Sequence, residues 1–136
     1  MNIFKTMLIA ASGMTAQSER MRIIAENLAN SNSTADTPSG TPYRRKISVF
    51  ASELDRAQGV DLVELKKTAV DKSPFGKRFE PGHPAADAAG YVLTPNVNPI
   101  IETMDMRDAQ RSYEAGLNVI SAARAMLSRT IDLLRS

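Results

Sequence analysis

The N-terminal part of the chain carries apolar residues at alternating intervals of three and four positions. The repeat is seven residues long, and seven of the eight residues at its two inward positions are apolar: Ile3, Met7, Ala10, Met14, Gln17, Met21, Ile24 and Leu28. Over about four heptads, this spacing is typical of a helix that packs along one seam, as in a coiled coil. We therefore expect a helix over residues 2–29.

This helix is expected to stop abruptly after Ala29. Residues 30–37 are mostly Asn, Ser and Thr, whose side chains compete for backbone hydrogen bonds. Pro38 follows, and the residue before a proline is pushed out of the helical region.

The C-terminal part repeats the helical pattern, and residues 100–135 predict a second long helix. Arg124 is the one polar interruption of its apolar stripe, with Ala123 next to it. The stripe consists of Met106, Ala109, Tyr113, Leu117, Ile120, Leu127, Ile131 and Leu134.

Between the helices the chain reads as strand and turn. All seven prolines lie between Pro38 and Pro99, and proline disrupts helix interiors. "YRRKISVF" alternates with period two and predicts a strand. "VDLVELKKTAV" fits a strand or a short helix, and "KRFEPGHPAADAAGYV" reads as strand, Gly/Pro turn and strand. "TPNVNP" should be extended, because two prolines restrict it.

These elements predict an α+β fold. Long N- and C-terminal helices pair as a coiled coil, and the middle segment is a small region rich in β-hairpin and loop. The expected division is an inner helical domain of residues 1–37 and 100–136, with an outer β- and turn-rich segment of residues 38–99. Ile9, Ala11, Ile23 and Ala25 lie off the N-terminal seam, so the helix pair is apolar on more than one face. Such a pair needs further partners, which indicates a subunit completed by neighbours in an assembly.

Composition narrows the function classes. A length of 136 residues suits one domain, and the net charge is only +2, with bases balanced by acids nearly everywhere. That balance argues against binding nucleic acid, which needs clustered Lys and Arg. There is no cysteine, and no run of 18 apolar residues that would span a membrane. The apolar run Met7–Ala11 is too short for a secretion signal, so we expect no cleaved signal peptide.

His83 is the only candidate for catalysis or metal binding. It is the single histidine, it sits in the turn "PGHP", and Asp87 follows four residues later. A small hydrolase using His83 and Asp87 would need a nucleophile or further ligands, and no such constellation is present. We expect a turn residue that hydrogen-bonds locally, no enzyme activity, no cofactor and no small-molecule substrate.

Two surface features leave alternatives open. The run "YRRK" at Tyr43–Lys46 could contact an anionic surface, line a solvated strand edge, or pair with acids of a neighbouring subunit; we favour the last two. The amphipathic ends could instead serve a peripheral membrane- or partner-binding module, but their polar faces are not rich in Lys.

The ordered motifs resemble those of a known family. "ASGMTAQSERMRIIAENLANSNST" is similar to the N-terminal signature of bacterial flagellar rod, hook and hook-associated proteins, in which an Ala-Asn-x-Asn-Thr-like run ends the helix. Ser33 stands where Thr is common, and Gly116 replaces the Asn of an Arg-x-Tyr-Glu-Ala-Asn run. "TPYRRK" and "EPGHPAADAAGYVLTPNVNP" narrow the resemblance to proximal rod proteins. The matching motif residues are Ala29, Asn30, Asn32, Tyr43, Arg44, Arg45, Pro81, His83, Pro84, Asp87, Gly90, Tyr91, Pro95, Asn96 and Asn98.

The resemblance implies a structural role in motility. Proteins of this family polymerise in helical order into the drive shaft of the basal body, and their paired termini line the inner tube. It also implies export by the flagellar type III apparatus without a cleaved signal. The implied partners are copies of the chain itself and other axial proteins of the FlgB, FlgF, FliE and FlgG types.

Overall fold

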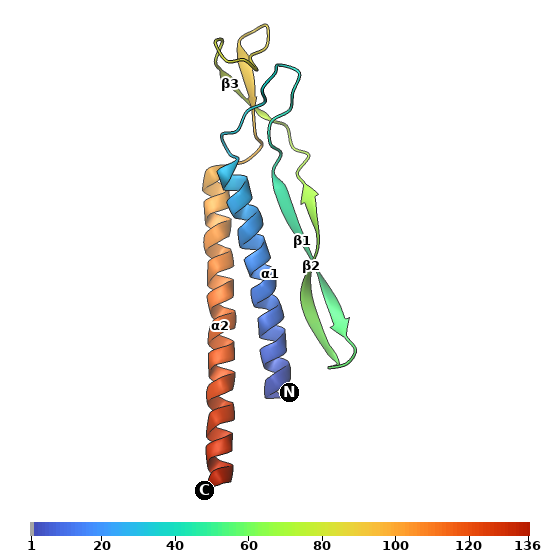
Figure 1. Ribbon diagram of the computed structural model, residues 1–136, viewed down its shortest axis with the longest axis vertical. Coiled ribbons are helices and arrows are strands. Elements are labelled where there is room, and N and C mark those ends of the chain that lie inside the picture. Colours follow the sequence, from blue (N-terminus) through green and yellow to red (C-terminus); the bar gives the residue numbers. More distant parts are fainter. Residues whose placement is uncertain (1) are drawn as a thin grey trace. The chain divides into compact units, whose positions relative to one another are not determined.

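The computed structural model describes residues 2–136 and contains two long helices and four strands in this part of the chain (Figure 1). The helices are α1, Ile3–Ala29, and α2, Pro99–Arg135, so both predicted helices are confirmed to within one residue at each end. The strands pair as two separate two-stranded sheets, β1 with β2 and β3 with β4. The predicted α+β class is therefore confirmed.

Asparagine side chains cap the start of both helices. Asn2 Oδ1 accepts a hydrogen bond from the Phe4 backbone N–H at 2.9 Å, and Asn98 Oδ1 accepts one from Ile100 at 3.0 Å. Pro99 occupies the first position of α2, where its missing N–H costs nothing. The family motif's "NP" is thus the start signal of the second helix.

The polar run after Ala29 ends α1 by occupying its last carbonyls. Asn30 Nδ2 donates to the Glu26 carbonyl at 2.9 Å, and Ser31 Oγ donates to the Leu28 carbonyl at 2.8 Å. Ser33 Oγ continues the series by donating to the Asn30 carbonyl. The backbone N–H groups of Asn30, Ser31 and Ser33 donate to the same three carbonyls, so the side-chain donors add a second hydrogen bond to each at the end that the sequence predicted.

The first sheet is a long hairpin of β1, Lys46–Asp55, and β2, Val60–Val70. The predicted strand at residues 43–50 begins three residues later and extends further, and the ambiguous stretch 60–70 is a strand rather than a helix. Asp55 closes the turn by accepting from the backbone of Ala57 and Gly59. Gly59 has φ +65°, a conformation that other residues adopt only at a cost.

The second sheet pairs β3, Gly76–Phe79, with β4, Tyr91–Thr94, in antiparallel register from Gly76 opposite Thr94 to Phe79 opposite Tyr91. The rings of Phe79 and Tyr91 make an edge contact with centroids 5.3 Å apart. Gly90, at φ +86°, begins the return strand, and a Cβ there would lie 2.9 Å from the Phe79 ring. The predicted strand–turn–strand of residues 77–92 is thereby confirmed.

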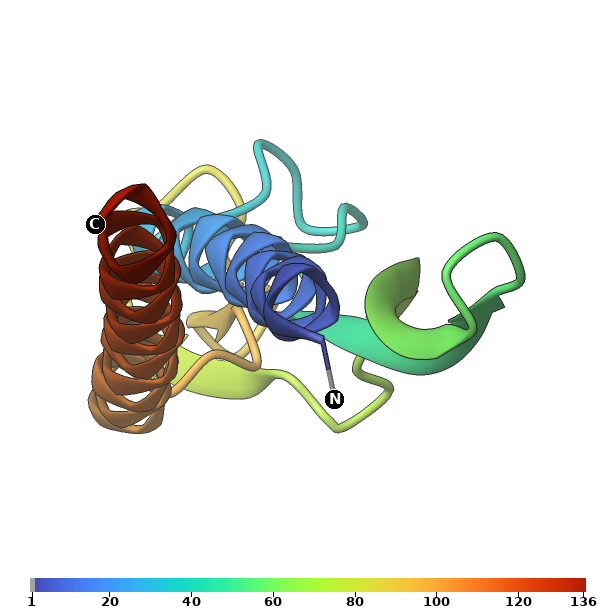
Figure 2. The same ribbon diagram turned by 90° about the horizontal axis from the view of Figure 1, so that it is seen from below.

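The chain forms two compact units, each drawing on both helices and one end of the β1–β2 hairpin. Unit 1 comprises the described residues up to Met21 together with Val49–Lys67 and Arg107–Ser136. Unit 2 comprises Arg22–Ser48 and Thr68–Met106. Within unit 1, α1 lies between α2 and the hairpin in both views (Figures 1 and 2).

Small residues mark the line of closest approach between the helices in unit 1. Ala109 and Ala123 of α2 are buried, and a Cβ at Gly116 would lie 2.6 Å from Met14 Cγ of α1. These three α2 positions are seven residues apart, as a helix seam requires. Leu117, which the sequence placed on the seam, is 48% exposed because the helices meet over its smaller neighbour.

In unit 2, α1 buries more than its predicted seam. Ile24 is buried as expected, but Ile23, which the sequence placed off the seam, is equally inaccessible. Val92 of β4 and Ala85 of the β3–β4 connection are also buried in this unit.

No helix of the described chain is long and apolar enough to cross a membrane.

Candidate assembly site

A buried asparagine organises the polar interior of unit 2. Asn27 is 1% exposed, and its amide makes four hydrogen bonds. Its Oδ1 accepts from the Tyr43 hydroxyl at 2.7 Å and from the Lys46 backbone N–H at 2.9 Å. Its Nδ2 donates to the Lys46 carbonyl at 2.9 Å and to Glu102 Oε2 at 3.2 Å. The side chain thereby joins α1 to the start of β1 and to α2 with no amide atom left unpaired.

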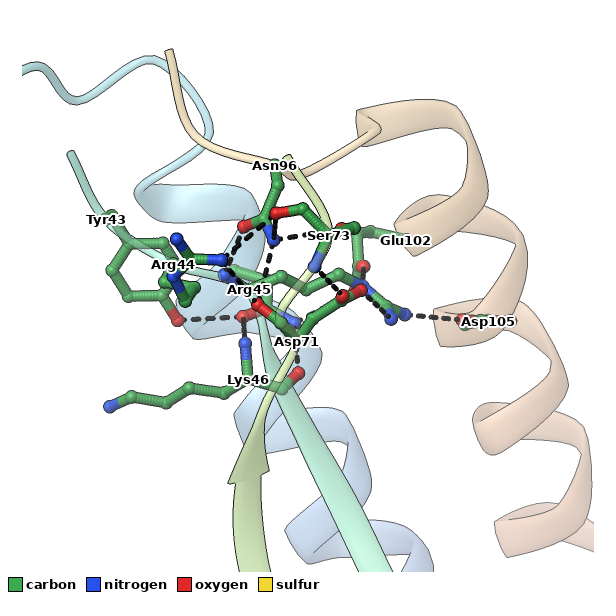
Figure 3. Close-up of polar contacts among 10 residues, drawn as sticks. Tyr43, Arg44, Arg45, Lys46, Asp71, Ser73, Asn96, Glu102 and Asp105 are labelled. Atoms are coloured by element: carbon green, nitrogen blue, oxygen red, sulfur yellow. Dashed lines mark hydrogen bonds and ion pairs between the residues drawn. The ribbon is translucent and has the colours of Figure 1, made fainter. Parts of the chain in front are cut away.

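Glu102 carries the second half of this arrangement (Figure 3). Its carboxylate is fully buried in the first turn of α2 and accepts from Arg45 Nε as well as from Asn27. The Arg45 guanidinium also lies 3.6 Å from carboxylate oxygens of Asp71 and of Asp105. The pKa of Arg45 is raised: burial disfavours its charge, but the Glu102 hydrogen bond and the three surrounding carboxylates outweigh that effect.

Asn96 fastens the segment before α2 to both strands of the hairpin base. Its Oδ1 accepts from the Arg45 N–H at 2.7 Å, and its Nδ2 donates to the carbonyls of Asp71 at 3.0 Å and Ser73 at 3.2 Å. Arg44 donates to the same two carbonyls at 3.0 Å and covers the Phe75 ring at 4.1 Å. Ser73 N–H hydrogen-bonds Asp71, which lowers the pKa of the Asp71 carboxyl, as does Arg45 to a smaller extent.

Tyr43 is held between its asparagine partner and two acids. Burial, and then the charges of Glu26 and Glu102, raise its pKa to about 12. Lys46 Nζ pairs with Glu26 beside the Tyr43 ring. We call the residues joined by these contacts the Asn27 cluster: Glu26, Asn27, Tyr43, Arg44, Arg45, Lys46, Asp71, Ser73, Asn96, Glu102 and Asp105.

The cluster corrects one of the two favoured interpretations of the "YRRK" run. Arg45 and Lys46 form ion pairs within the chain, and Arg44 hydrogen-bonds the hairpin base. These residues are half-buried and Tyr43, Arg44 and Arg45 precede β1, so a solvated strand edge does not describe them, whereas the contact with a neighbouring subunit stays a prediction. The period-two pattern suggested an ordinary strand edge, but the acids that fold back onto these residues come from sites distant in the sequence, which a local pattern does not reveal.

His83 has a structural role in the turn of unit 2. Its Nδ1 accepts a hydrogen bond from the Ala85 N–H at 3.0 Å, so Nε2 carries the ring hydrogen and faces Thr34 Oγ1 at 3.2 Å. Asp87 instead accepts from the backbone of Ala89 and Tyr91 at 2.9 Å. The predicted locally bonded turn residue is confirmed, and the two side chains do not form a hydrolytic pair. No group of His and acidic residues in the described chain has the geometry of a metal site.

The remaining motif residues divide into buried and exposed positions. Pro95 and Gly90 are buried, and Asn30 and Asn98 serve the helix ends described above. Exposed motif residues are Ala29, Asn32, Pro81, Pro84, Asp87, Tyr91 and Asn98.

The predicted seam residues also divide by position. One group is half-buried: Ile3, Met7, Met14, Met21, Leu28, Met106, Tyr113, Ile120 and Leu127. Leu117, Ile131 and Leu134 are exposed, the last at 83%. The end of α2 therefore presents apolar side chains that no described residue covers.

Six cluster members were not singled out by the sequence: Glu26, Asn27, Asp71, Ser73, Glu102 and Asp105. Asn27 lies next to the predicted seam, and Glu102 reads as an ordinary acid in the first turn of a helix, where acids are common. Nothing in either local pattern indicates burial. Only the meeting of α1, α2 and the hairpin makes these two side chains interior.

Two known protein families match the two ends of the chain. The family described as flagella basal body rod protein matches residues 7–35. The family described as flagellar basal body rod FlgEFG protein C-terminal matches residues 88–133. Together with the paired terminal helices, these matches define the class as flagellar axial proteins of the basal-body rod.

Full-length relatives narrow the class to one family. The chain is 52% identical to a flagellar basal-body rod protein FlgC of Agrobacterium fabrum over 94% of this chain and 92% of that protein. It is 38% identical to a FlgC of Salmonella typhimurium and 35% identical to a FlgC of Borreliella burgdorferi, over at least 96% of each chain compared. The chain belongs to the FlgC family, and it is a structural subunit of the flagellar basal-body rod.

Proposed function

We propose that copies of this chain polymerise with other axial proteins into the proximal part of the rod, a helical drive shaft that transmits torque from motor to hook. The observation that carries this proposal is the apolar end of α2, where Ile131 and Leu134 are 46% and 83% exposed. Exposed apolar stripes of this kind mark protein contacts. Both residues continue the seam by which α2 packs on α1.

In this proposal the helices form the inner wall of the tube, and residues 38–99 form the outer layer. The seam residues predicted from the sequence are then the self-assembly contacts, including those half-buried in the single chain. The Asn27 cluster holds each subunit in one conformation, so that every copy presents the same surfaces. A helical polymer needs this uniformity, because each contact is repeated along the filament.

The proposed neighbours are copies of this chain and axial proteins of the FlgB, FlgF, FliE and FlgG types. The chain would reach them through the flagellar type III export apparatus without a cleaved signal. We further propose that it catalyses no reaction, since its one histidine serves a turn. The alternative of a peripheral membrane-binding module is not favoured, because the relatives are rod proteins.

The test uses a flagellated bacterium that lacks its own FlgC. Ile131→Asp with Leu134→Asp places two charges on the exposed seam and should abolish rods, because an unpaired charge in an apolar contact costs about 3 kcal/mol or more. Ala122→Asp with Ala125→Asp adds the same charges to exposed positions on the opposite side of α2 and should leave rods intact. Electron microscopy of basal bodies is the readout.

Two results would contradict the proposal. One is the absence of rods when the unmodified chain is expressed in a host whose other axial proteins accept a close relative. The other is normal rods built from the seam variant, with the two variant proteins folding equally well by circular dichroism.

A further inference from the structure

An open groove of about 950 Å³ lies within unit 1 between α1 and the far end of the hairpin. Ser12 and Thr15 line its α1 side, and Leu54, Leu62 and Val63 supply apolar side chains from the two strands. Ser12 Oγ accepts from the Val63 N–H at 3.3 Å, which ties β2 to the helix at this place. Leu54 and Val63 nevertheless remain 56% and 42% exposed, so the groove presents apolar surface that the chain itself does not cover.

The groove is rimmed by acids. Glu53, Asp55 and Glu64 line it, and Arg56 is the only base among its lining residues. The Glu53 carboxyl hydrogen-bonds Glu64 and repels its charge, and both effects raise the pKa of Glu64. No ion pair joins either glutamate to a base in the described part of the chain. Two neighbouring carboxylates beside apolar side chains favour a partner surface that carries both apolar and positively charged side chains.

The end of α2 has the complementary chemistry. α2 contains 37 residues and α1 contains 27, and Gly116 lies against Met14, so residues of α2 beyond about 127 extend past the start of α1. The exposed residues Ile131 and Leu134 share one face of this overhang, and Arg135 lies along one edge of that face. Arg124 lies along the same edge, one turn before the overhang begins. Asp132 is the only acid after Glu114, against three arginines.

We propose that the C-terminal overhang of α2 docks into the hairpin groove of a second copy of this chain. The apolar face of the overhang then covers Leu54 and Val63, and Arg124 and Arg135, along one edge of that face, lie opposite Glu53 and Glu64. The two surfaces differ, so the contact is head-to-tail and leaves a free groove and a free overhang at the ends of any open chain of copies. This inference rests on the proposed function, because it assigns that function a surface and a partner.

Crosslinking tests the contact in solution, independently of rod assembly. The chain contains no cysteine, so any introduced pair is unique. One purified full-length variant carries Val63→Cys, a second carries Leu134→Cys, and the two are mixed under mild oxidation at high protein concentration. We expect a disulfide-linked heterodimer. The matched control replaces Val63→Cys by Val70→Cys, an equally exposed valine of β2 outside the groove, and should give about tenfold less product.

Charge reversal provides a second test of the proposed contact. Arg124→Glu with Arg135→Glu in the overhang partner should reduce crosslinking by about tenfold, and Glu53→Arg with Glu64→Arg in the groove partner should restore it. All four positions are exposed, so circular dichroism should show folded variants.

Equal product with the Val70→Cys control, or no recovery on double reversal, would overturn the inference. A groove that takes a helix from a different protein or a lipid surface would likewise give no link between copies. Failure of the proposed function has another signature, which is the absence of rods in cells expressing the unmodified chain.

Discussion

The side-chain amide of Asn27 donates to the Glu102 carboxylate across 3.2 Å, at a place where both side chains are almost wholly inaccessible. The contact joins the last turns of α1 to the first turn of α2, 75 positions apart in the sequence. It closes a network in which every amide atom of Asn27 has a partner. Buried polar groups stabilise one arrangement strongly when all are paired, and they are costly when one is removed.

Replacing Asn27 by alanine should therefore destabilise the chain by about 3 kcal/mol, because a buried network loses its central member. Tyr43 and Glu102 would each lose one hydrogen bond, and the Lys46 backbone would lose two. The matched control is Asn32→Ala, at an exposed position three residues past the helix, which should change stability by less than about 0.5 kcal/mol. Urea unfolding measures both, and equal effects would refute the role given to Asn27.

Removing the Glu102 carboxylate alone should cost about 3–5 kcal/mol, because Arg45 loses its closest partner in a partly buried site. The double variant Arg45→Met with Glu102→Leu should recover much of this loss, since it replaces the ion pair by apolar contacts. Glu114→Ala, on an exposed part of α2, is the control and should be nearly neutral. A double variant less stable than Glu102→Ala would show that the arginine serves mainly Asp71 and Asp105.

The raised pKa of Tyr43 predicts that the chain loses stability in alkaline solution. This pKa is about 12 in the folded chain, against 10.0 for an ordinary tyrosine. The proton is thus held more tightly when folded, so this contribution is complete below pH 10 and is lost as the pH rises towards 12. Tyr43→Phe should be about 1 kcal/mol less stable below pH 10, through loss of its hydrogen bond, and the difference from the parent should shrink above it. Denaturation at several pH values measures this difference, which should not stay constant.

Gly116 and Met14 should be coupled. Alanine normally stabilises a helix by about 1 kcal/mol relative to glycine, but a Cβ at position 116 would lie 2.6 Å from Met14 Cγ. Gly116→Ala should therefore be destabilising in the parent chain, by about 1–3 kcal/mol for overpacking. In a Met14→Ala background the same change should be stabilising. A double-mutant cycle measures the coupling, and simple additivity would mean that the helices do not approach closely here.

The helix seam should matter more than the histidine. Ile120→Asp puts a charge at a half-buried seam position and should cost about 3 kcal/mol and abolish swimming. His83→Ala removes the contacts to Thr34 and Ala85, which should cost about 1–2 kcal/mol while swimming persists. Swimming in soft agar, with unfolding of the purified variants, gives the comparison. Motility that survives the first change but not the second would contradict the structural role of the turn.

Local pattern was sufficient for most elements of this fold. The heptads, the Asn and Ser run, and the proline distribution predicted both helices and their ends, because periodicity and capping act over a few neighbouring residues. The Gly/Pro turn between β3 and β4 was equally readable. The strand at residues 60–70 was ambiguous, since its apolar spacing suits either conformation and only pairing with β1 selects the strand.

The line of the α2 seam depended on tertiary contact. Leu117 is larger and more apolar than Gly116, so a sequence pattern favours it for the interior. The helices instead meet over Gly116 because a small residue there admits Met14 of α1. The burial of Ile23 was likewise not predictable from the apolar pattern, because it requires a face of α1 beyond the predicted seam to be covered.

By itself, the sequence determined the two helices, the turn-rich middle and the need for partners, because each of these follows from the apolar pattern along the chain. The tertiary structure decided which charged side chains form ion pairs with one another. Arg45 and Lys46 looked available to a neighbour, but the fold brings Glu26 and Glu102 to them from opposite ends of the chain. An ion pair acts over a few ångströms in space, whatever the separation in sequence, so its partners became identifiable only when α1, α2 and the hairpin met.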